Sequence, residues 1–121
     1  KVLNSPHADK EVFGAAAYAI GESENLIPNA GKILKEILNS PKADAKVLGL
    51  VAESIGDSDF PILEASEIIR NILESPRADE GTISAVVNAI EYTTNPILES
   101  EELLKEARRI KEELSKMNHD D

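Results

Sequence analysis

The stretch Ile37–Gly56, ILNSPKADAKVLGLVAESIG, decides the fold, because a relative of it occurs once before and, less completely, once after. A Ser-Pro pair recurs every 35 residues, beginning at Ser5, Ser40 and Ser75. An aspartate follows each pair at the same offset, as Asp9, Asp44 and Asp79. A fixed period is explained more simply by the stacking of similar units than by one active site. We therefore interpret the chain as a repeat protein.

Each unit is predicted to contain two helices joined by a short polar link. Apolar residues spaced three and four apart begin just after each aspartate, so the aspartate is expected to cap the first helix. In the first unit Ser5, with Pro6 at the first helical position, is the alternative cap to Asp9. The predicted first helices are Lys10–Gly21, Ala45–Ile55 and Glu80–Ile90, and the predicted second helices are Ile27–Leu38, Ile62–Leu73 and Ile97–Met117.

Glycine recurs at two positions of the unit. Gly21 is expected to end its helix in the left-handed conformation that favours glycine. Gly14 and Gly49 share a position inside the first helices, with Ser84 as their counterpart. Because glycine inside a helix costs about 1 kcal/mol relative to alanine, its recurrence indicates close helix contact there.

The two ends of the chain depart from the repeat. Val2 and Leu3 stand at the positions of Ile37 and Leu38, so the sequence opens on the last turn of a helix. A trimmed sequence, a short native stub and a longer parent all explain this, and we favour trimming. At the other end Arg108 replaces a recurring leucine, which predicts a polar helix that caps the repeats, with residues 118–121 as a frayed tail.

Composition limits the possible classes of function. The 121 residues carry a formal net charge of −10, which disfavours a nucleic-acid partner. The length suits one domain, with repeat units at about 2–38, 39–73 and 74–117. Cysteine is absent, and no apolar run is long enough to span a bilayer, so no membrane association and a cytoplasmic location are expected.

The residues of the first two units resemble HEAT repeats, especially the short type found in phycobilin lyases. The resemblance lies in GAAAYAIGESENLIPNAGKILKEIL at 14–38 and VAESIGDSDFPILEASEIIRNIL at 51–73. An alanine-rich first helix ends in an aliphatic-Gly pair, and a Leu- or Ile-rich second helix follows an acidic link. Glu91 departs from this pattern because it replaces the glycine in the third unit. The resemblance implies an all-α fold, a short right-handed α-solenoid of about three HEAT-like helix pairs with an extended C-terminal capping helix.

No catalytic constellation emerges from the sequence. A cationic residue also recurs at one repeat position, as His7, Lys42 and Arg77. Like the aspartates, these residues are interpreted as helix caps and bridges between repeats. The alternative is a row of charges that binds the backbone or acidic groups of a partner. Asp57-Ser58-Asp59 begins like a calcium loop, but Phe60 and Pro61 follow where a ligand and a glycine are needed. His7 and His119 lack the spacing of a zinc pair. We therefore expect no enzyme activity, no cofactor and no metal.

The remaining candidate is a surface. In α-solenoids the second helices usually line the concave side, where protein partners bind. Tyr18 is predicted to be exposed, since Glu53 and Asn88 are its counterparts, and it could anchor an interface. The candidate partner-binding residues are Lys32, Lys35, Glu36, Glu64, Glu67, Arg70, Asn71, Glu102, Lys105, Glu106 and Tyr18.

The leading hypothesis is a non-enzymatic protein–protein interaction or scaffold module. The alternative is a small-ligand-binding accessory subunit or enzyme of the bilin-lyase-like type. A third possibility is a homodimer through an apolar N-terminal edge formed by Val2, Leu3, Phe13 and Tyr18.

Overall fold

The computed structural model describes residues 10–23, 29–58, 62, 64–93 and 95–119. In these ranges the chain forms six α-helices and no strand, so the all-α prediction is confirmed. The helices are α1 (Lys10–Glu22), α2 (Ala30–Asn39), α3 (Ala45–Asp57), α4 (Ala65–Glu74), α5 (Glu80–Tyr92) and α6 (Ser100–His119).

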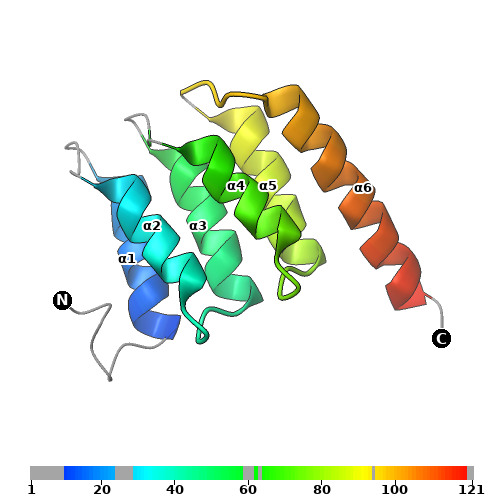
Figure 1. The fold of residues 1–121 in the computed structure, drawn as a ribbon, viewed down its shortest axis with the longest axis horizontal. Coiled ribbons are helices and arrows are strands. Elements are labelled where there is room, and N and C mark those ends of the chain that lie inside the picture. The colour runs from blue at the N-terminus through cyan, green and yellow to red at the C-terminus, as the bar shows by residue number, and fades with distance from the viewer. Residues whose placement is uncertain (1–9, 24–28, 59–61, 63, 94, 120–121) are drawn as a thin grey trace.

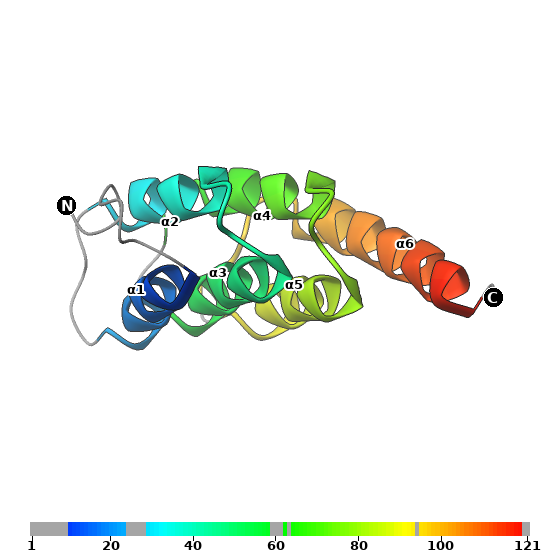
Figure 2. The ribbon, with the colours of Figure 1, turned by 90° about the horizontal axis from the view of Figure 1, so that it is seen from below.

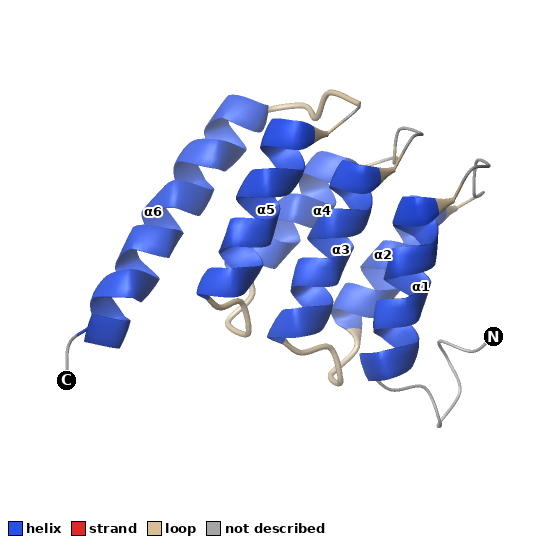
Figure 3. Ribbon diagram, turned by 180° about the vertical axis from the view of Figure 1, so that it is seen from behind, coloured by secondary structure: helices blue, strands red, loops and turns tan. Residues whose placement is uncertain are grey.

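The helices lie in two layers. Figure 1 shows successive helices running up and down along the molecule, and Figure 2 shows α1, α3 and α5 beneath α2 and α4. Seen from behind in Figure 3, α1, α3 and α5 lie side by side. Helix α3 contacts both α1 and α5, while α4 contacts both α2 and α6. Helices α1 and α6 therefore lie at opposite ends of the row.

Aspartates cap two of the first helices as predicted. The Oδ1 atom of Asp44 accepts a hydrogen bond from the Val47 amide at 3.0 Å, and Asp79 Oδ1 accepts one from the Thr82 amide at 2.8 Å. The buried Thr82 hydroxyl also lies 2.9 Å from the Ala45 carbonyl at the start of α3. The cap of α5 thus joins it to the preceding first helix. Asp9 lies outside the described residues.

The second helices begin three residues later than predicted. Asn29, Glu64 and Glu99 precede them with φ of 64°, 65° and 61°, a left-handed conformation that is uncommon for residues other than glycine. Each link therefore turns sharply before its helix starts. The apolar residue ahead of the turn still packs on the core, since Ile97 is 8% exposed and Ile62 is partly buried.

The prediction that Gly21 ends α1 as a left-handed cap is wrong. No glycine in the described ranges has positive φ, and α1 continues to Glu22. A Cβ atom on Gly21 would lie 2.9 Å from Ser54 Cα, and one on Gly56 would lie 2.8 Å from Ala89 Cα. Glycine recurs here because two helix backbones approach closely. At the position predicted to be in close contact, a Cβ on Gly14 would lie 3.0 Å from Leu50 Cδ1 of α3, whereas a Cβ on Gly49 would find its nearest neighbour at 3.8 Å, so the prediction is confirmed at Gly14 and wrong at Gly49.

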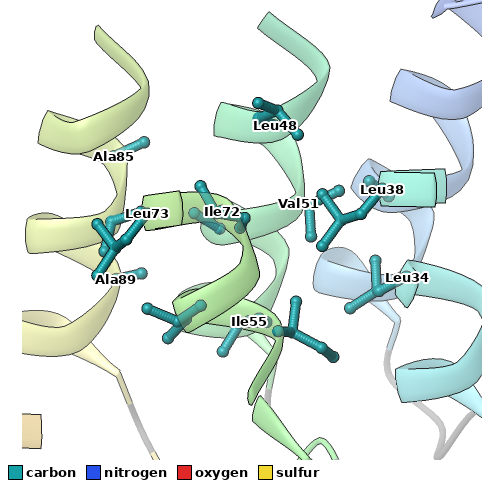
Figure 4. Close-up of a cluster of buried hydrophobic side chains, with 14 of the residues drawn as sticks. Leu34, Leu38, Leu48, Val51, Ile55, Ile72, Leu73, Ala85 and Ala89 are labelled. Atoms are coloured by element: carbon teal, nitrogen blue, oxygen red, sulfur yellow. The ribbon is translucent and has the colours of Figure 1, made fainter. Parts of the chain in front are cut away.

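The core lies between the two layers. Figure 4 shows Leu34 and Leu38 of α2 facing Val51 of α3, with Ile72 of α4 near the same helix and Leu73 of α4 drawn beside Ala89 of α5. Leu34, Ile72 and Val51 are fully buried because the apolar faces of both layers meet there. Phe13, expected at an exposed N-terminal edge, is only 3% exposed, so that expectation is corrected. Val2 and Leu3 lie outside the described residues.

Helix α6 is longer than the other five and carries the predicted polar surface. Arg108, Arg109, Lys111, Glu112 and Glu113 are all exposed, as expected from the replacement of leucine at position 108. The Arg108 guanidinium lies 3.3 Å from the Glu91 carboxylate of α5. The helix runs to His119, so the predicted tail does not begin at 118.

The glycine contacts give a paired stability prediction. Gly56→Ala places a methyl group against the backbone of α5 and should lower the free energy of unfolding by about 1–3 kcal/mol, as overpacking does. Gly49→Ala has room for the methyl group and should be neutral or stabilising by up to about 1 kcal/mol. Urea denaturation followed by circular dichroism measures both. Equal effects of the two changes would contradict the close contact at Gly56.

Candidate functional site

Ten of the eleven candidate residues lie on, or immediately before, α2, α4 and α6, the three predicted second helices. Lys32, Lys35 and Glu36 are on α2, and Glu102, Lys105 and Glu106 are on α6. Between them α4 carries Glu67, Arg70 and Asn71, with Glu64 as its N-cap residue. We call these ten residues the second-helix face. Tyr18 is not brought to it, because it is on α1 in the other layer; it is 63% exposed, as predicted.

An ion-pair ladder joins successive helices of this face. The Lys35 ammonium bonds to the Glu64 carboxylate and lies 3.1 Å from Glu67 Oε2. Hydrogen bonds from its side chain to Glu64 first, and then to Glu67, raise the pKa of Lys35. Since Lys35 is on α2 and the two glutamates belong to α4 and its cap, the ladder links α2 to α4.

The same pattern repeats one unit later. Arg70 Nη2 lies 2.7 Å from Glu99 Oε2, and the hydrogen bond with Glu99 raises the pKa of Arg70. Arg70 is 35 residues after Lys35, and Glu99 is 35 residues after Glu64. Glu99 was missed as a site residue, although this equivalence would have identified it. Glu102, the counterpart of Glu67, adds a favourable charge interaction with Arg70.

Among the described residues the ladder has two steps, one at Lys35 and one at Arg70. Lys105 follows Arg70 by 35 residues, and the described residues place no carboxylate in an ion pair with it. Lys32 stands where Glu67 and Glu102 stand in later units, so the first unit has a cation in place of an acid. In the part of the chain that is described, Lys32, Glu36, Asn71 and Lys105 make no hydrogen bond or ion pair through their side chains.

Glu106 is held within α6. Arg109 Nη2 lies 2.5 Å from Glu106 Oε1, and Arg109 Nη1 lies 2.7 Å from Glu113 Oε1. The hydrogen bond from Arg109 lowers the pKa of Glu106, and the opposing desolvation is weaker. Glu106 therefore contributes to the charge pattern of its own helix and not to the ladder between helices.

Arg77 bridges two units. Its Nη1 atom donates to the carbonyls of Ser40, at 3.0 Å, and of Ala43, and its Nη2 atom donates to the Leu38 carbonyl at 3.2 Å. Leu38 is in the last turn of α2, whose final carbonyls lack helical partners. The interpretation as a bridge between repeats is confirmed for Arg77. His7 lies outside the described residues.

No metal centre is apparent in the described ranges, where no group of three or more His, Asp or Glu side chains is placed to hold an ion. Asp57 ends α3, and the rest of the calcium-like motif at 59–61 lies outside those ranges. No described helix is both long and apolar enough to cross a membrane. Comparisons with protein families, curated proteins and solved structures found no match to this chain.

The Arg77 bridge predicts a loss of stability on substitution. Arg77→Met should lower the free energy of unfolding by about 1–3 kcal/mol, because it removes charged donors from three carbonyls. The matched control is Lys46→Met, which removes an exposed cation from α3 without removing such donors. Urea denaturation compares the variants with the wild type. A loss no greater in Arg77→Met than in Lys46→Met would contradict the bridge.

The ion pair between Arg109 and Glu106 predicts a shift in the titration of the Glu106 carboxyl. The Glu106 carboxyl should titrate below the pH of an ordinary glutamate, and Arg109→Gln should bring it back. Because folding lowers the pKa of Glu106, its pair with Arg109 makes a small contribution to the stability of the folded state above the ordinary pKa of glutamate. That contribution is lost as the pH falls through the lowered pKa of Glu106. Side-chain carboxyl NMR measures this. Arg108→Gln is the control, since Arg108 pairs with Glu91, and it should leave the Glu106 titration unchanged.

Proposed function

We propose that the chain is a non-enzymatic protein–protein interaction module of the HEAT-like type, a short right-handed solenoid that binds a partner through its second-helix face. The observation that carries the proposal is the joining of α2, α4 and α6 into one charged surface by the Lys35 and Arg70 ion pairs. A surface held together in this way is preorganised, which lowers the cost of ordering its side chains on binding.

The residues outside the ladder are the ones we propose to contact the partner. Lys32, Glu36, Asn71 and Lys105 lie on three neighbouring helices and lack partners among the described residues. Lys35 is paired with Glu64 and Glu67, and Arg70 is paired with Glu99, so these charges already have partners within the chain. In this proposal the ion-paired residues position the helices, and the other four residues contact the partner protein.

The alternative, a small-ligand subunit, has less support. Two grooves of the described residues have volumes of about 260 and 290 Å³. Pockets for small molecules occupy roughly 300–1,000 Å³ and enclose most of the ligand. These grooves are at or below the lower end of that range, and neither is lined by residues of the second-helix face other than Glu64.

A charge-reversal experiment tests the proposal. Lys32→Glu together with Lys105→Glu should abolish capture of a stoichiometric protein partner from the native lysate, because both cations are free to pair with a partner. The control is Lys46→Glu together with Lys111→Glu, which makes the same charge change on α3 and on the exposed side of α6. Tagged chains are compared by mass spectrometry, with circular dichroism as the test of folding.

Two outcomes would contradict the proposal. One is a partner retained by the folded Lys32→Glu/Lys105→Glu variant, which would place binding elsewhere on the molecule. The other is a wild-type chain that captures no protein and shows a thermal shift with a metabolite, which would favour the small-ligand alternative.

A further inference from the structure

A groove between α3 and α5 lies in the layer opposite the second-helix face. Its volume is about 260 Å³. The exposed residues that line it are Glu53, Asp57, Asn88 and Tyr92, and the buried ones are Gly56, Ala85 and Ala89. We call it the Tyr92 groove. It belongs to none of the residues that the proposed function uses.

The floor of the Tyr92 groove is formed by the closest helix contact of this pair. Gly56 has no side chain, and a Cβ there would lie 2.8 Å from Ala89 Cα. Ala85 and Ala89 are also small, so the two backbones approach and the larger side chains stand around the contact. The groove is thus fixed by the helix packing, and it does not depend on a mobile loop.

The groove is negatively charged and lacks an internal cation. Glu53 and Asp57 form no ion pair within the part of the chain that the structure describes. Neither α3 nor α5 has a basic residue in its last turn. Acidic side chains at a helix C-terminus add to the negative end of the helix dipole, where cations are favoured. The position of Asp57 is therefore unfavourable for the isolated fold.

The neighbouring first helices strengthen this charge. Helices α1, α3 and α5 run in the same direction, so their C-terminal ends lie together at the upper edge of Figure 1. Glu22 ends α1, and Glu91 is in the last turn of α5. Of these acids only Glu91 has an ion-pair partner among the described residues, which is Arg108. Three helix C-termini thus lie along one edge, and Glu22 and Asp57 are the acids there that have no ion-pair partner among the described residues.

Tyr92 adds an aromatic surface at the edge of the same groove. Its side chain is 78% exposed, although it is among the largest apolar groups on the molecule. A cation near the face of an aromatic ring is attracted by the quadrupole of the ring. A groove of about 260 Å³ is below the range of small-molecule pockets, and its size suits a single long side chain.

From this charge complementarity we propose that the Tyr92 groove binds a Lys or Arg side chain in a basic segment of another protein. The cationic head lies beside the carboxylates of Glu53 and Asp57 and near the face of the Tyr92 ring. The proposal is independent of the second-helix face, because none of its residues is on α2, α4 or α6.

An NMR titration tests this proposal. The probe is a peptide of alternating Arg and Gly residues, added to the ¹⁵N-labelled chain, with a peptide of alternating Gln and Gly as the uncharged comparison. Amide shifts should concentrate at Glu53, Asp57, Asn88 and Tyr92. E53Q/D57N should weaken Arg-peptide binding by roughly tenfold or more, because charge-assisted hydrogen bonds are lost. Y92A should weaken it, whereas Y92F should retain it because the ring remains.

The matched control is E74Q/E101Q, which removes the same charge at exposed positions outside the groove. It should bind the Arg peptide nearly as the wild type does. Equal weakening by E53Q/D57N and E74Q/E101Q, or shifts spread over the whole acidic surface, would overturn the proposal in favour of general attraction to net charge. Spermidine that bound with the same shifts and affinity would overturn the assignment to a protein partner. Thermal unfolding of each variant shows that the groove remains folded.

Discussion

The close approach of the first helices is the constraint on which the rest of the structure depends. Gly21 meets Ser54, and Gly56 meets Ala89, at the same position of successive units. Because backbones so close allow no side chain between them, the spacing within the layer is fixed at these points. With this spacing the Thr82 hydroxyl reaches the Ala45 carbonyl of the preceding first helix. The Arg77 guanidinium likewise reaches the Leu38 carbonyl at the end of α2.

The layer of second helices is held by a different interaction. There the ion pairs of Lys35 and Arg70 connect each helix to the next, and exposed ion pairs of this kind contribute little to stability. The buried apolar contacts of the core and the glycine contacts stabilise the fold, whereas the ladder gives Lys35 and Arg70 partners and leaves Lys32 and Lys105 without an ion pair among the described residues. Lys105 occupies the repeat position of Lys35 and Arg70, and it forms no ion pair among the described residues.

The sequence period was sufficient to predict the number and order of the helices and the caps at Asp44 and Asp79. It did not predict where the second helices start, because Glu64 and Glu99 adopt a left-handed conformation that is uncommon for glutamate. The prediction that Gly21 ends α1 failed because glycine near a helix end usually adopts the left-handed capping conformation, which Gly21 does not adopt. The role of Gly21 depends on its contact with the backbone of Ser54, which is 33 residues away in the sequence. The sequence around Gly21 does not reveal that contact.

The ladder could have been found from the sequence, because its cations and acids recur at the same period as the Ser-Pro pairs. The Tyr92 groove could not, since Tyr92, Asp57 and Glu22 share one repeat position without sharing a residue type. Variation at an exposed position of a repeat costs little in stability, so residues there are free to differ between units. Acids that lack partners at helix C-termini nevertheless run against the local electrostatic preference, and such exceptions are where a functional explanation is most informative. Glu53 and Asp57 on α3, like Lys32 and Lys105 on the second helices, are therefore exposed charges that form no ion pair among the described residues.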